Sequence, residues 1–139
     1  MLRVLRAFDG EGVDYVLIGA AAMGFHGVVR ATEDLDLVIR ATTENVERLK
    51  RAFRAGDLLG DYPAVRYYPP AGDLYFDVMT RLGEAASFET VAQETKEVEG
   101  IRVRVATPAA LYRLKKATVR PLDRQDAEAL RRRFVLQEE

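Results

Sequence analysis

Ile18-Gly19-Ala20 and Asp34-Leu35-Asp36-Leu37, separated by thirteen residues, are the two segments from which the architecture of this chain is inferred. The first closes the continuous apolar run Tyr15-Val16-Leu17-Ile18, which is typical of a buried strand. The small residues from Gly19 to Ala22 then favour a helix packed closely on a sheet. Because glycine lets the backbone approach other groups closely, the sequence predicts a tight strand-to-helix bend at Gly19.

The second segment alternates polar and apolar residues over 33–39, which predicts a strand. Asp34 and Asp36 are two residues apart and therefore share a face, with roughly 6.6 Å between them along the strand. Carboxylates placed in this way can converge on two metal ions that lie ~3.5–4 Å apart. Hard oxygen ligands suit Mg²⁺, which takes the rest of its shell from water and phosphates. The alternative is a solvated strand edge.

Asp77 is the best third ligand for such a metal site. Residues 73–79 alternate again, with Leu74, Phe76 and Val78 on one face and Asp77 on the other. Asp77 can reach Asp34 and Asp36 if the two strands are neighbours. The helix that begins near Gly19 adds free backbone N–H groups and a partial positive charge, which bind phosphate. Close helix–sheet packing is the alternative explanation for its small residues.

The remaining pattern predicts an α/β fold with a small mixed sheet, helices mainly on one face and two C-terminal helices. Further elements are expected as helices over 2–10, from 42 or 43 to 53, from 107–108 and from 121, and as strands over 64–68 and 101–105 with a hairpin turn at Glu99-Gly100. Residues 85–93 are ambiguous. We expect a single domain over residues 1–139.

Composition excludes several classes of protein. The chain has no cysteine, so it forms neither disulfides nor thiolate metal sites. No apolar run approaches the ~20 residues of a membrane span, and the first six residues are too charged for a signal peptide. We therefore expect a cytoplasmic protein without a membrane partner. The only histidine, His26, is interpreted as structural, with a functional role as the alternative.

Charge is unevenly distributed along the chain. The net charge is −1, yet residues 111–133 hold eight basic and three acidic residues, a balance of +5, which leaves −6 for the remainder. One interpretation is a pair of solvated helices, and the other is a basic wall that faces phosphates across an acidic metal site. The overall charge argues against strong non-specific binding of nucleic acid.

The two quoted segments together resemble the signature of the nucleotidyltransferase superfamily related to DNA polymerase beta. Arg30-Ala31-Thr32-Glu33-Asp34-Leu35-Asp36-Leu37 is similar to the version found in aminoglycoside and lincosamide nucleotidyltransferases and in the toxin nucleotidyltransferases of abortive-infection type II toxin–antitoxin systems. The stretch Thr107 to Lys115, followed by Arg120, Asp123 and Asp126, resembles the C-terminal helix pair of the toxin type.

The resemblance implies a Mg²⁺-dependent enzyme that transfers a nucleoside monophosphate from an NTP such as ATP to a tRNA, a protein or a small molecule. It also implies an antitoxin-like protein partner as one possibility. Two Mg²⁺ ions would be held by Asp34, Asp36 and Asp77, and Asp77 would act as base. The nucleotide would be bound by Gly19, Ala20, Arg30, Thr32 and Asp123, and Lys115 would contact phosphate or substrate. An ion pair with Glu33 is the alternative role for Arg30.

Ala20 departs from the family pattern, because glycine or serine is usual at that position and alanine has no hydroxyl group. This difference leaves open an alternative function, a catalytically weak nucleotidyltransferase-like module that acts through a protein partner. A metal-dependent nuclease is disfavoured, because the chain lacks the acidic-x-Lys partner that such enzymes carry on the strand after the first aspartate.

Overall fold

A computed structural model describes residues 2–27, 34–53, 64–67, 75–82, 86–116 and 121–134. Within these ranges it describes only the backbone of Leu2, Asp34, residues 64–67, Tyr75, Leu82, Lys115, Lys116, residues 121–124 and Asp126. The elements follow in the order α1 (Leu2–Glu11), β1 (Tyr15–Ile18), α2 (Gly19–Phe25), β2 (Asp34–Ile39), α3 (Thr43–Phe53), β3 (Ala64–Tyr67), β4 (Tyr75–Met79), β5 (Arg81–Leu82), β6 (Ala86–Ser87), β7 (Gln93–Val98), β8 (Ile101–Ala106), α4 (Pro108–Lys116) and α5 (Pro121–Phe134).

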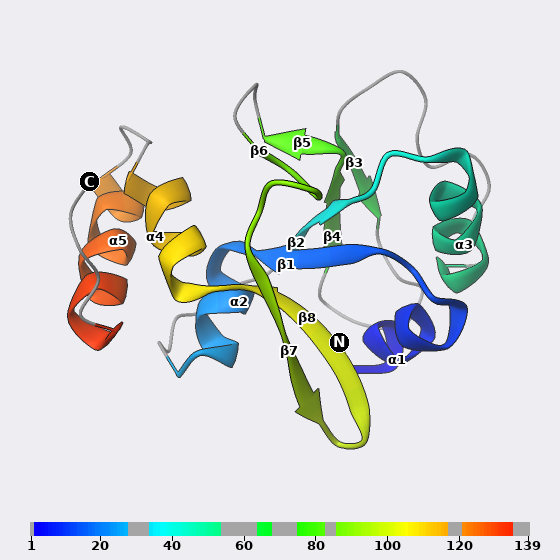
Figure 1. The fold of residues 1–139 in the computed structure, drawn as a ribbon, viewed down its shortest axis with the longest axis horizontal. Helices are drawn as coiled ribbons and strands as arrows, with labels where there is room; N and C mark the ends of the chain where they lie inside the picture. Colours follow the sequence, from blue (N-terminus) through cyan, green and yellow to red (C-terminus); the bar gives the residue numbers. More distant parts are fainter. Residues whose placement is uncertain are drawn as a thin grey trace.

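Six strands form one mixed sheet in the order β3-β4-β2-β1-β8-β7, and β5 pairs with β6 in a separate ribbon (Figure 1). Two pairs are parallel, β1 with β8 and β2 with β4. The other three pairs of the sheet are antiparallel. The α/β class, the mixed sheet and the two C-terminal helices predicted from the sequence are confirmed.

An aromatic cluster anchors α1 and α3 to the sheet. The ring of Phe8 on α1 lies 5.1 Å from that of Tyr15, 5.2 Å from that of Phe53 and 6.2 Å from that of Phe76. All four side chains are buried, and Figure 1 shows the two helices side by side at one end of the molecule. Such tilted and edge-on ring pairs add about 0.5–1.5 kcal/mol each beyond the apolar area they bury.

A polar residue is buried near the start of α3. Leu49 and Phe53 are buried and Val46 is half-buried, but Asn45 takes the third buried position, with 1% of its surface exposed. Its amide accepts a hydrogen bond from the Asp14 N–H at 2.7 Å and donates to the carbonyls of Asp14 and Arg40, each at 2.9 Å. Asn45 is buried because these bonds satisfy its polar atoms.

The turns and caps near the C-terminal half follow the sequence signals closely. Glu99 and Gly100 both have positive φ, +48° and +80°, as a tight hairpin turn between β7 and β8 requires. The Thr107 hydroxyl accepts a hydrogen bond from the Ala110 N–H at 3.2 Å and thereby caps α4 ahead of Pro108. None of the helices that the structure describes has the length and apolar content needed to cross a membrane.

Candidate active site

Asp36 and Asp77 occupy directly opposite positions on the neighbouring parallel strands β2 and β4. On the other side of β2, Asp36 is opposite Ile18, the last residue of β1. Because opposite residues in a sheet share a face and adjacent strands lie about 4.8 Å apart, the two carboxylates emerge side by side. Both residues are half-buried. The strands are therefore neighbours, which is the condition that the sequence argument set for a shared site.

The backbone bend at Gly19 packs directly against the Asp36 carboxylate. Gly19 has a φ of +70°, in the left-handed region that glycine adopts readily. A β-carbon built on Gly19 would lie 2.7 Å from Oδ2 of Asp36, closer than real side chains approach. The predicted strand-to-helix bend and the carboxylate pair thus meet at one place, with Ala20 following in the first turn of α2.

The other predicted site residues are placed only by their backbone or lie outside the described ranges. Asp34 is the first residue of β2 and is paired with Tyr75. Lys115 lies near the end of α4, and Asp123 lies near the start of α5. Arg30 and Thr32 lie outside the described residues. Among the side chains that the structure does describe, His, Cys, Asp and Glu form no group of three or more able to hold a metal ion.

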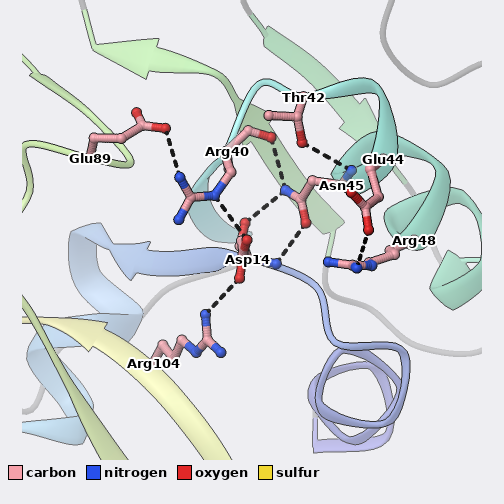
Figure 2. Close-up of polar contacts among 8 residues, drawn as sticks. All are labelled: Asp14, Arg40, Thr42, Glu44, Asn45, Arg48, Glu89 and Arg104. Carbon is pink, nitrogen blue, oxygen red and sulfur yellow. Dashed lines mark hydrogen bonds and ion pairs between the residues drawn. The ribbon is translucent and has the colours of Figure 1, made fainter.

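A polar network at the opposite end of β1 was not anticipated from the sequence (Figure 2). Asp14 accepts hydrogen bonds from Arg40 at 2.9 Å and from Arg104 at 3.1 Å. Arg40 also pairs with Glu89 at 3.3 Å and lies over the ring of Phe88, 4.6 Å from its centre. Burial raises the pKa of Asp14, but the two guanidinium groups outweigh it and hold that pKa below its usual value. The only sequence signal was the position of Asp14 and Arg40 at strand ends.

His26 connects three elements, which agrees with its interpretation as a structural residue. Its ring is buried, with Nε2 2.7 Å from the Ala106 carbonyl oxygen on β8. Nδ1 lies 3.5 Å from a carboxylate oxygen of Glu94 on β7. Because a carbonyl can only accept, Nε2 carries the proton that forms the shorter contact. The ring therefore links the C-terminal end of α2 to the β7–β8 hairpin.

Part of the basic charge on α5 is neutralised within the helix itself. Glu128 accepts hydrogen bonds from Arg131 at 2.9 Å and from Arg132 at 3.1 Å. The hydrogen bond from Arg131, more than that from Arg132, lowers the pKa of Glu128 to about 2. This turn of α5 agrees with the interpretation of solvated helices. Arg113 on α4 and Arg133 on α5 are also exposed.

No protein-family model and no curated protein matches the sequence. Solved structures do match. An antigenic nucleotidyltransferase-like protein from Paracoccidioides brasiliensis is 20% identical, with a TM-score of 0.61 over 93% of this chain and 74% of that chain. ANT(2'')-Ia, solved in complex with adenylyl-2''-tobramycin, is 16% identical, with a TM-score of 0.62 over 94% of this chain and 85% of that chain. A candidate nucleotidyltransferase from Thermotoga maritima is 16% identical, with a TM-score of 0.59 over 94% of this chain and 88% of that chain.

These similarities define the class of fold to which the chain belongs. It has the nucleotidyltransferase fold, and at the level of the fold the resemblance drawn from Ile18-Gly19-Ala20 and Asp34-Leu35-Asp36-Leu37 is confirmed.

Proposed function

We propose that this protein transfers a nucleoside monophosphate from an NTP to an acceptor hydroxyl group and releases pyrophosphate. The observation that carries the proposal is the meeting of Asp36, Asp77 and the Gly19 bend at one place on the sheet. The fold it shares with nucleotidyltransferases supports the same reaction class. In one of those structures an adenylyl group is attached to tobramycin, the product that such a transfer gives.

The donor set fits Mg²⁺. Two carboxylates on opposite positions of adjacent strands repel each other, and a divalent cation between them would relieve that repulsion. Oxygen donors alone suit a hard divalent ion, and the chain offers no cysteine that would favour a softer metal. Asp34, Asp36 and Asp77 would hold two Mg²⁺ ions, which when bound neutralise charge on the triphosphate.

The chain's own groups would position the substrates and move one proton. The backbone N–H groups at Gly19 and Ala20 would bind the triphosphate in this proposal. The nucleotide site would be completed by Arg30, Thr32, Lys115 and Asp123. Asp77 takes the proton of the acceptor hydroxyl group. The acceptor oxygen then bonds to the α-phosphorus, the bond from that phosphorus to the bridging oxygen breaks, and pyrophosphate leaves. Positioning and charge neutralisation are the main sources of rate in such reactions.

Transfer is tested by incubating the protein with Mg²⁺, NTPs labelled at the α-phosphate and a pool of RNA, protein and small-molecule acceptors. The expected result is a labelled acceptor with wild-type protein and at least a 100-fold slower reaction with Asp36→Asn or Asp77→Asn. Glu47→Gln, at an exposed position on α3, should leave the rate unchanged. Labelling that persists in both aspartate variants would refute the proposal.

Ala20 favours a second candidate function, a nucleotide-binding module that acts through an antitoxin-like protein partner. Alanine at this position keeps the backbone N–H group but supplies no hydroxyl group to a phosphate oxygen. The two functions differ in one measurement. A module of this kind gains thermal stability from Mg²⁺ and ATP in an Asp36-dependent way, about 2.7 kcal/mol when ligand is present at 100 times its Kd, and yet labels no acceptor.

A further inference from the structure

One row of residues crosses four strands at the candidate active site. Arg66 on β3 is directly opposite Asp77 on β4. Asp77 is opposite Asp36 on β2, and Asp36 is opposite Ile18, the residue before the Gly19 bend. The order along the row is therefore one arginine, two aspartates and the bend. Arg66 was not among the residues singled out from the sequence.

The row has two chemically different ends. Position 66 lies on the terminal strand of the sheet, roughly 10 Å from position 36, because each step between strands is about 4.8 Å. In the proposed function the triphosphate lies at the Gly19 end and Asp77 takes the proton of the acceptor. The acceptor would then lie beside Asp77, the aspartate whose neighbour on β3 is the arginine.

An arginine at that end would discriminate between acceptors by charge. A guanidinium group is positively charged at every physiological pH and binds phosphate oxygens in pairs. Such a group would attract an acceptor that carries a phosphate close to its reacting hydroxyl group and would repel a polyamine such as tobramycin. The other charges of the row are negative, so an anionic acceptor meets its only complementary charge in this row at position 66.

We propose that Arg66 selects the acceptor, and that the acceptor of this protein carries a phosphate next to its nucleophilic hydroxyl group. The inference rests on the proposed nucleotidyl transfer and extends it to the second substrate. A simpler role for Arg66 is to hold Asp77 by a cross-strand ion pair. That role alone would slow transfer to every acceptor equally, whereas selection changes the ranking of acceptors.

The experiment compares wild type with Arg66→Gln, Arg66→Glu and Arg66→Lys on four acceptors: a short single-stranded RNA, adenosine 5′-monophosphate, adenosine and tobramycin. For the phosphate-bearing acceptors we expect kcat/KM to fall at least tenfold in Arg66→Gln, mainly through KM, and further in Arg66→Glu. For adenosine and tobramycin, kcat/KM should change less than twofold or rise. Arg66→Lys should restore most of the activity, and Arg6→Glu, exposed on α1, should have no effect.

Two readouts keep the inference separate from the proposed function. The Kd of Mg²⁺-ATP should stay within twofold in all Arg66 variants, since the nucleotide end of the row is unchanged. Binding of fluorescent RNA measured without NTP should weaken at least tenfold in Arg66→Glu but not in Arg6→Glu, even if wild type transfers nothing. Equal RNA binding by wild type and Arg66→Glu, or an equal loss for all four acceptors, would overturn the inference. A response to RNA but not to adenosine 5′-monophosphate identifies nucleic acid as the source of the phosphate.

Discussion

At Gly19 the space that a side chain would fill is already taken by the carboxylate of Asp36. The backbone there also has a φ of +70°, which costs an L-residue other than glycine about 1–2 kcal/mol. Gly24 in the same helix makes a useful contrast, because a β-carbon there meets nothing within 4 Å. A single hydrogen in place of a methyl group therefore lets the bend and the carboxylate share one place.

Gly19→Ala should lower the free energy of unfolding by about 1–2 kcal/mol and displace the Asp36 carboxylate. The reduced stability is measured by urea denaturation, and the displacement by loss of Mg²⁺-dependent thermal stabilisation. Gly24→Ala should be neutral or stabilising by up to about 1 kcal/mol, as for a glycine inside a helix. An alanine at position 19 with wild-type stability would show that the bend does not need glycine.

At the scale of elements, Asp14 joins β1 to β2 and β8 through Arg40 and Arg104. Its carboxylate is about one quarter exposed, so these ion pairs are only partly screened by water. The folded-state pKa lies below the usual value of 3.8. Because a lowered folded pKa means that the unfolded state takes up the proton first, the stabilisation is present above pH ~3.8 and is lost as the pH falls through the folded pKa.

Asp14→Asn should therefore be less stable than wild type at pH 7 by about 1 kcal/mol, and this difference should shrink as the pH falls below 4. Urea denaturation of both proteins at several values between pH 7 and pH 3 measures the difference. Glu97→Gln, at an exposed position on β7, serves as the control, and its free energy of unfolding should change with pH as that of wild type does. A difference that stays constant with pH would mean that the Asp14 charge does not stabilise the fold.

The hairpin between β7 and β8 contains a strained residue, since Glu99 has a φ of +48°. Asparagine tolerates this conformation much better than glutamate and is preferred before glycine in such turns. Glu99→Asn should raise the free energy of unfolding by about 0.5–1 kcal/mol, seen as a higher Tm. Gly100→Ala, which puts a side chain at a φ of +80°, should lower the free energy of unfolding and the Tm. If both changes left the Tm unaltered, the turn would not contribute to stability.

Local elements were predicted where the signal is local. The apolar run of β1, the alternation of β2 and the turn at Glu99-Gly100 all appear as expected. The two-residue strands β5 and β6 were missed, because so short a segment has no period. Asn45 was missed because its burial depends on the backbone of Asp14, 31 residues away. Likewise, the opposition of Asp36 to Asp77 and of Arg66 to Asp77 depends on register between distant strands.

At the scale of the whole molecule, one aromatic cluster joins segments from residue 8 to residue 76. Phe8 contributes to three of its ring pairs and is completely buried. The same cluster includes Phe76, the residue before Asp77, so it holds β4 in place beside β2. Core stability and the position of the carboxylate pair are therefore expected to depend on each other.

Phe8→Ala should lower the free energy of unfolding by about 3–5 kcal/mol, because it removes a buried ring and leaves a cavity. Chemical denaturation measures this loss. Phe134→Ala, at a half-buried position on α5, should lower the free energy of unfolding by clearly less than Phe8→Ala does. If the two variants were equally stable, the Phe8 cluster would not be a principal part of the core.

The register between β4 and β2 determines two things at once: the burial of the apolar face of β4 and the position of the Asp77 carboxylate. Successive residues of a strand point to opposite faces, so sliding β4 by one position would turn Asp77 towards the interior and bring Phe76 and Val78 out to water. Mutations that loosen this strand should therefore cause inactivity and aggregation together. Substitutions in β4 that abolish activity and yet leave the protein soluble should therefore be rare during evolution, because the buried apolar face of the strand fixes the position of Asp77.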